Sequence, residues 1–235
     1  STEHHGGLDA WFAQEALRFR YDYRPQAGTR RASVQTVDVL KARVYHDLEH
    51  PVDGRFAFDG ATAWMKLDGG AAYPARFWAL TPYYFVGMPF VLGDPGVNLA
   101  IVDDDPRAAG FAAADVVKAT FDPGTGDAPE DYYVLYLAPE TGRLLGLRYV
   151  VSYAPFMQDG MEHTPEKLLV YEAYEPVGPL TLARRHAFFA FGEGRKGKQV
   201  TTALVSDVQY GADFDESKLV MPEGAVVDDS LESTR

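Results

Sequence analysis

The sequence predicts a mainly β protein of the α+β class, in which a single antiparallel sheet of about eleven strands curves into a half-barrel. The clearest observation is Leu17–Arg24, where every odd position is apolar or aromatic and every even position is charged. This period of two is typical of a strand with one buried and one wet face. The chain also holds 14 Tyr and 14 Phe, which favour strands. Short turns join the extended segments, which indicates antiparallel pairing.

The elements follow in a simple order. Residues Thr2–Gln14 are expected to form a short N-terminal helix with Trp11 and Phe12 at its buried end. In Phe56–Trp64, Asp59-Gly60 predicts a two-residue type I′ hairpin turn, because both residues tolerate positive φ. The other expected strands are Leu17–Arg24, Ser33–Leu40, Ala42–Leu48, Val116–Phe121, Tyr132–Ala138, Leu144–Tyr153, Leu168–Tyr174, Thr181–Phe191 and Val200–Tyr210. A sheet with so many strands is expected to curl.

We expect one domain over residues 1–227 and a polar tail over 228–235. The net charge of −12 would repel a phosphate backbone, so no nucleic-acid partner is expected. The chain has no Cys and can therefore form neither a disulfide nor a thiol nucleophile.

The segment Phe77–Val102 is the most apolar part of the chain and carries one charged residue, Asp94. Its prolines and glycines argue against a membrane-spanning helix. We expect Phe77–Leu92 to be a partly helical lid over a cavity, stopped by Pro89, followed by a turn and strand-like Val97–Val102. The side chains expected to line the cavity or its lid are Trp64, Phe77, Trp78, Tyr83, Tyr84, Phe85, Met88 and Phe90.

Apolar walls with few polar groups are what a lipid-like ligand requires, and a thioether adapts to chains of different shape. The first hypothesis is therefore a non-enzymatic protein that binds a hydrophobic small molecule or lipid, with no catalytic residues and no cofactor. An alternative is a scaffold or interaction protein in which the same segment only fills the core.

A second alternative is a zinc-dependent hydrolase, because His46, Glu49 and His50 match the H-x-x-E-H motif. That chemistry needs a helix to bring both imidazoles to one face. The stretch is instead rich in β-branched residues, and Pro51 follows His50 immediately. A solvated strand end is the favoured interpretation, so no metal is expected.

Three stretches resemble the LolA/LolB-like superfamily of periplasmic lipoprotein carriers. Phe58–Trp64 is similar to the family's DGxxxW hairpin, Pro139–Leu147 to its central strand–turn–strand, and Asp215–Ala225 to its C-terminal Pro-x-Gly signature. The chain resembles more closely an uncharacterised domain family of secreted bacterial proteins, on His5–Trp11, Met88–Gly96 and Gly126–Tyr133.

These resemblances imply an antiparallel half-barrel that helices close over a hydrophobic interior. They also imply an exported protein of the periplasm or cell envelope, in many cases tethered to a membrane by an N-terminal lipid. We expect a monomer. The resemblances do not name a ligand.

Overall fold

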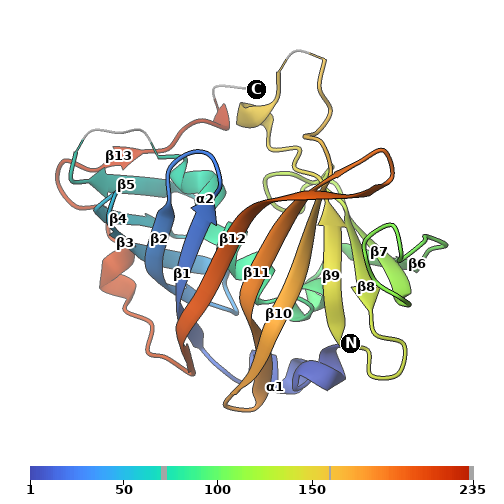
Figure 1. Ribbon diagram of the computed structural model, residues 1–235. Helices are drawn as coiled ribbons and strands as arrows, with labels where there is room; N and C mark the ends of the chain where they lie inside the picture. Colours follow the sequence, from blue (N-terminus) through green and yellow to red (C-terminus); the bar gives the residue numbers. More distant parts are fainter. Residues whose placement is uncertain (70–72, 159, 233–235) are drawn as a thin grey trace.

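The protein is built on one open antiparallel sheet that curves strongly (Figure 1). The computed structural model describes residues 1–69, 73–158 and 160–232. Within them, thirteen strands lie in the order β13-β5-β4-β3-β2-β1-β12-β11-β10-β9-β8-β7-β6. The predicted half-barrel of LolA type is confirmed, with more strands than expected.

The strands are β1 (Ala16–Pro25), β2 (Arg31–Asp38), β3 (Arg43–Glu49), β4 (Gly54–Phe58), β5 (Ala63–Leu67), β6 (Val97–Ile101), β7 (Asp115–Phe121), β8 (Tyr133–Leu137), β9 (Leu144–Tyr149), β10 (Lys167–Val177), β11 (Leu180–Gly192), β12 (Arg195–Tyr210) and β13 (Val226–Val227). The two-residue β13, which pairs with β5, has no counterpart in the sequence prediction. The final residues of the predicted tail, 233–235, lie outside the described residues.

The first and the last long strands of the chain, β1 and β12, pair in the middle of the sheet. Strands β1–β5 run outward in sequence order, and β6–β12 return until the long β12 pairs with β1. The register shifts between Arg18 and Arg20 in the β1–β12 pair, and twice between Phe188 and Phe191 in the β11–β12 pair. Such bulges bend a strand and increase its twist, so these central strands are where the sheet curves.

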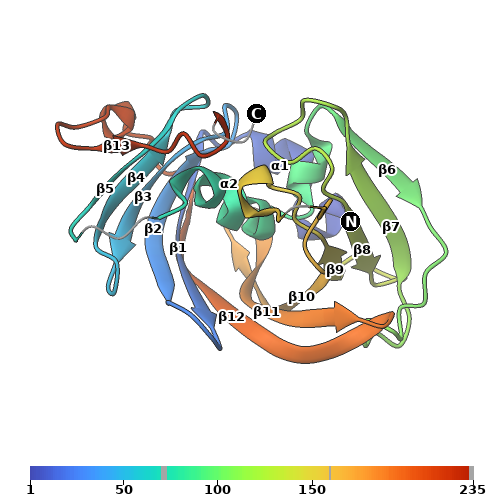
Figure 2. The same ribbon diagram turned by 90° about the horizontal axis from the view of Figure 1, so that it is seen from above.

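Of the two α-helices in the described residues, the first lies at the end of the sheet near the N-terminus (Figure 1) and the second lies in the hollow of the sheet (Figure 2). The first, α1 (Leu8–Phe12), follows a 3-10 helix at Thr2–His5, so the predicted N-terminal helix is divided at two glycines with positive φ, Gly6 and Gly7. The second, α2 (Ala75–Val86), packs against β3, β4 and β5. In the described part of the chain, no helix combines the length and the hydropathy that crossing a membrane requires.

Helix α2 is hydrogen-bonded to both halves of the sheet. Nε2 of His46 on β3 donates to the carbonyl of Ala79 at 2.9 Å. The hydroxyl of Tyr171 on β10 donates to the carbonyl of Phe85 at 3.1 Å. The amide of Arg76 donates to the carboxylate of Asp228 at 2.8 Å, which satisfies one of the free N–H groups of the first turn. These contacts fix the helix across the concave face.

The helix ends earlier than the sequence predicted. The chain leaves α2 at Gly87, whose amide donates to the carbonyl of Tyr83, and Pro89 then precedes a 3-10 helix at Phe90–Gly93. The glycine has no room for a side chain, because an added Cβ would lie 2.9 Å from Val91. The helix therefore ends at Val86, next to the closely packed Gly87. The prediction that Pro89 ends the helix is wrong.

The core below this turn is an aromatic stack. The ring of Phe90 is fully buried and lies parallel to the indole of Trp11, with 4.7 Å between ring centres. The ring of Tyr83 packs near the same indole at 5.9 Å. This stack joins the N-terminal helix to the segment after α2.

The convex face of β1 is polar, as its alternation predicted. Its centre is Asp22, which is fully buried beneath Arg20, Arg24 and Arg30. Hydrogen bonds and charge from Arg30 and Arg24 outweigh the effect of burial and hold the pKa of this carboxyl well below its usual range.

One hairpin turn differs from expectation. The β4–β5 loop has four residues, because Phe58 pairs with Ala63 and the Asp59 carboxylate accepts the amides of Ala61 and Thr62. The two-residue turn with two positive φ angles occurs instead at Glu193-Gly194, between β11 and β12. The β4–β5 loop is thus longer than predicted, and hydrogen bonds from its own backbone amides to the Asp59 side chain stabilise it.

Replacing Phe90 by Ala should destabilise the protein by about 3–5 kcal/mol, because a fully buried ring leaves a cavity in a packed core. Urea unfolding measures this change. The control is Ile101→Ala on the edge strand, where the side chain is 90% exposed and the cost should stay near about 0.5 kcal/mol. Equal costs for the two variants would contradict the assigned core.

Stability should also fall in acid through His46. Burial lowers its pKa from 6.5 to about 3, so the folded protein binds fewer protons than the unfolded chain between these values. The stability that depends on neutral His46 is therefore fully present above pH 6.5 and is lost as the pH falls toward about 3. In His46→Gln, which keeps a donor for Ala79, the free energy of unfolding should depend on pH less steeply, by up to about 1.4 kcal/mol per pH unit. Parallel slopes from urea unfolding between pH 6.5 and about 4.5 would refute this role.

Candidate functional site

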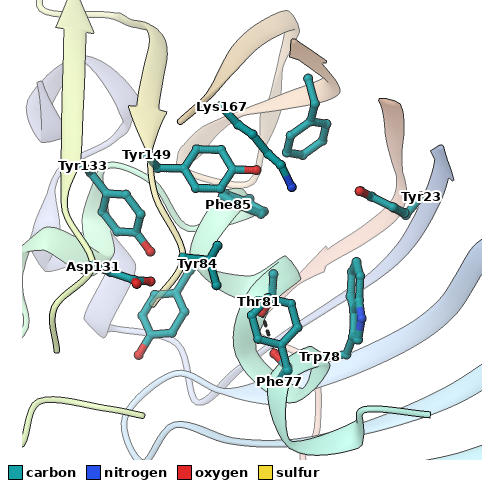
Figure 3. Close-up of a pocket in the computed structure, with 12 residues that line it drawn as sticks. Tyr23, Phe77, Trp78, Thr81, Tyr84, Phe85, Asp131, Tyr133, Tyr149 and Lys167 are labelled. Carbon is teal, nitrogen blue, oxygen red and sulfur yellow. Dashed lines mark hydrogen bonds between the residues drawn. The ribbon is translucent and has the colours of Figure 1, made fainter. Parts of the chain in front are cut away.

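A cavity of about 100 Å³ lies between α2 and the concave face of the sheet (Figure 3). Its walls come from α2, from strands β1, β8, β9, β10 and β11, and from the residues that border β8 and β9. The lining residues are Tyr23, Phe77, Trp78, Thr81, Tyr84, Phe85, Asp131, Tyr133, Tyr149, Val151, Lys167 and Phe188.

The helix side of the cavity follows from helical periodicity. Phe77, Thr81, Tyr84 and Phe85 recur at intervals of four, three and one, which places them on one face of α2. The Phe85 ring lies 5.4 Å from that of Tyr149 and 5.5 Å from that of Phe188, both in edge-to-face geometry. This ring therefore joins the helix to the sheet at one end of the cavity.

The sheet side follows from strand register. Tyr133, Tyr149 and Lys167 lie directly opposite one another on β8, β9 and β10. Residues paired in this way share a face, so all three side chains project to the concave side. On β1, Tyr23 packs edge-to-face against Trp78, with 5.1 Å between ring centres.

One acidic and one basic side chain line this mainly aromatic space. Oδ1 of Asp131 accepts from the amide of Ser152 at 2.5 Å and from its hydroxyl at 2.7 Å, yet burial outweighs these bonds and raises the pKa of Asp131 to about 6. Burial lowers the pKa of Lys167 from its ordinary value. Both shifts report a local environment of low polarity.

A second cavity of about 110 Å³ is also lined by residues of α2. It shares Phe77, Thr81 and Asp131 with the first. The two spaces therefore adjoin each other at these three side chains. Each is smaller than the roughly 300–1,000 Å³ of a usual small-molecule site.

Larger hollows occur elsewhere on the described part of the chain. One of about 380 Å³ lies between the N-terminal segment and β6–β8, and another of about 480 Å³ lies beside Trp64. The first has no charged side chain in its lining. We take the α2 cavity as the candidate site, because it combines aromatic enclosure with ionisable groups that point inward.

Four of the eight residues expected at the cavity line it: Phe77, Trp78, Tyr84 and Phe85. The structure places Tyr83, Met88 and Phe90 in the main core instead. Their side chains lie on the far side of α2 or beyond its end, where they pack with the N-terminal helix. Sequence alone cannot separate these two groups, because the whole segment is apolar.

The position of Trp64 differs most from expectation. Its indole N–H donates to the carbonyl of Leu219 at 2.8 Å, and its ring packs with Tyr45 and Ala57 on the convex side. Strand alternation puts Ala63 and Met65 toward the main core and Trp64 on the opposite face. It does not contribute to the concave cavity.

Sequence reasoning missed the sheet wall. The residues are Tyr23, Asp131, Tyr133, Tyr149, Val151, Lys167 and Phe188, and Thr81 on α2 was missed as well. Alternation could have assigned Tyr23 to the buried face of its strand. The remaining strand residues needed the cross-strand register, which the sequence did not provide.

The H-x-x-E-H stretch does not form a zinc motif. His46 lies within strand β3, and His50 follows the end of that strand. Both ring nitrogens of His46 are engaged, Nε2 with Ala79 and Nδ1 with the hydroxyl of Ser33 at 3.1 Å. Among the described residues, no three His, Cys, Asp or Glu side chains come together as a metal site.

No protein-family model matches the chain, and no curated protein matches it in sequence. Solved structures do match. A LolA superfamily protein from Nitrosomonas europaea superposes with a TM-score of 0.58 at 9% identity, over 94% of this chain and 96% of that one. The chain has a LolA-like fold.

Two further structures agree with this LolA-like fold. A DUF1329 family protein from Desulfovibrio piger gives a TM-score of 0.57 at 10% identity, over 91% of this chain and 92% of that one. A domain from Vibrio parahaemolyticus assigned to outer membrane lipoprotein sorting gives 0.52 at 10% identity, over 93% and 97%. The resemblance predicted from the sequence is confirmed at the level of the fold. Similarity at such low identity does not identify a ligand.

Replacing Phe85 by Ala should cost less than replacing Phe90, below about 3 kcal/mol, because one side of the Phe85 ring already faces the cavity. The two variants are matched in chemistry and differ in surroundings. Urea unfolding of both gives the comparison. A loss for Phe85→Ala equal to that for Phe90→Ala would mean that this segment is packed as ordinary core.

Proposed function

We propose that this protein binds a hydrophobic, acyl-like ligand between α2 and the concave face of its sheet, without catalysing a reaction. The observation that carries this proposal is the aromatic cavity, whose walls come from both the helix and the strands. Rings on both sides offer flat apolar contacts to a flexible chain.

Because the cavity is too small for an acyl chain, this proposal requires α2 to act as a lid that moves when the ligand enters. The two spaces around Phe77 and Thr81 would merge if α2 moved away from the sheet, because they share these residues. The helix contains Pro82, which cannot donate to the carbonyl of Trp78 and so weakens the helix in its middle. A ligand would take the place of aromatic contacts such as those of Phe85.

The fold supports a location in the bacterial cell envelope. One structural neighbour is assigned to outer membrane lipoprotein sorting and another to the LolA superfamily. We extend this location, and a monomeric state, to the present chain as part of the proposal. A membrane tether through an N-terminal lipid belongs to the same proposal.

A filled core is the second candidate, and the cavity volume of about 100 Å³ favours it. In that case α2 would be a permanent plug and the protein a scaffold or an interaction partner. The two candidates differ in whether an added apolar molecule can enter.

The test is titration with a fluorescent fatty-acid probe. Val151 lines the cavity, and Val151→Trp would fill it with a larger ring. We expect this variant to bind the probe at least about tenfold more weakly than the parent, a difference of about 1.4 kcal/mol.

The control is Val220→Trp, the same substitution at a side chain that is 70% exposed. It should leave probe affinity unchanged. Failure of the parent protein to bind the probe would reject ligand binding in favour of the filled core. Unchanged probe affinity in Val151→Trp would mean that the probe binds elsewhere.

A further inference from the structure

Lys167 is unusual among the residues of the concave face. It begins β10 and is half-buried, and Leu169 and Tyr171 follow it on the same face in the main apolar core. Within the described residues, its ammonium takes part in no ion pair and no hydrogen bond. In Figure 3 it points into the cavity, toward the space between Tyr149 and Tyr23. The described part of the chain therefore gives this charge no internal partner.

Two tyrosine hydroxyls accompany this ammonium. Tyr149 lies directly opposite Lys167 on β9, and Tyr133 lies opposite Tyr149 on β8. Neither hydroxyl hydrogen-bonds to another described residue. An ammonium has three donors and no acceptor, and each hydroxyl can donate once. One wall of the cavity is therefore rich in hydrogen-bond donors.

The one carboxylate in the lining does not balance this charge. Oδ1 of Asp131 accepts two hydrogen bonds from Ser152, and the carboxylate lies beyond ion-pair distance of Lys167. A cationic ligand would meet an ammonium with no internal partner, whereas an anionic one would provide its missing counter-charge. Removing an unpaired ammonium from water is costly, and a bound anion offsets that cost.

We propose that the cavity recognises an amphiphile with an anionic headgroup, a carboxylate or a phosphate, through Lys167 and the hydroxyls of Tyr149 and Tyr133. The apolar chain of the ligand lies along the aromatic face of α2, between Phe77 and Phe85. This inference rests on the proposed function, because it assigns a headgroup site to the same cavity. Lys167 binds the ligand and performs no chemistry.

The test compares three probes that share one alkyl chain: dodecanoate, dodecyl phosphate and the uncharged 1-dodecanol. Each displaces the fluorescent fatty-acid probe from the full chain. The parent should bind at least one of the two anions about tenfold or more tightly than the alcohol, since hydrogen bonds to charged groups are the stronger ones. Which anion binds more tightly identifies the headgroup.

Three variants test the residue itself. Lys167→Met keeps the length of the side chain without its charge, and it should bring the preference for an anion over the alcohol close to one. Lys167→Arg keeps the charge and should retain most of the preference. Lys198→Met makes the same change at an exposed position on β12 and should leave the preference unchanged.

The outcomes separate the two proposals. Binding of none of the three probes by the parent would overturn both the proposed function and this inference. Equal binding of anion and alcohol, or a preference that survives in Lys167→Met, would overturn the headgroup site and leave hydrophobic binding intact. Circular dichroism of each variant verifies folding, and if Lys167→Met does not fold, Tyr149→Phe takes its place and should lower the preference severalfold.

Discussion

The structure depends on one constraint: a wide antiparallel sheet has an apolar face to bury, and the described residues supply two short α-helices to cover it. The sheet must therefore wrap around α2, a helix of 12 residues. Bulges in the central strands let it do so. The cavity lies where the side chains on one side of α2 do not completely fill the space between the helix and the strands. It therefore results from the way the sheet curves around α2.

The interface beneath α2 is not purely apolar. Ser33, His46 and His186 are buried on the concave side, and the carbonyl of Ala79 serves as the partner of His46. In the described chain, Nε2 of His186 has no hydrogen-bond partner. Buried polar groups of this kind reduce the net free energy of helix docking. The helix is thus held at specific points, while the aromatic stack of Trp11 and Phe90 provides the tighter packing.

These features link the fold to the proposed ligand. In the proposed function, a ligand displaces α2 from the sheet. A helix that a few hydrogen bonds hold in place can be displaced more readily than one that is packed on all sides by apolar side chains. The two small spaces around Phe77 mark where an alkyl chain would enter in this proposal, and Lys167 supplies a charge that has no counter-ion among the described residues. Structural neighbours of LolA type share the architecture, whereas the ligand depends on the side chains of this chain.

The sequence by itself determined the fold class. Alternation at Leu17–Arg24 fixed the faces of β1, and the resemblance at Phe58–Trp64, Pro139–Leu147 and Asp215–Ala225 indicated the half-barrel, because both depend on local patterns. Only the tertiary structure decided which face of the apolar segment meets the cavity. Phe85 and Phe90 are equivalent in sequence terms, yet one lines the cavity and the other stacks on Trp11. The position of Lys167 depends on register across three strands, a relation between distant segments that no local pattern contains.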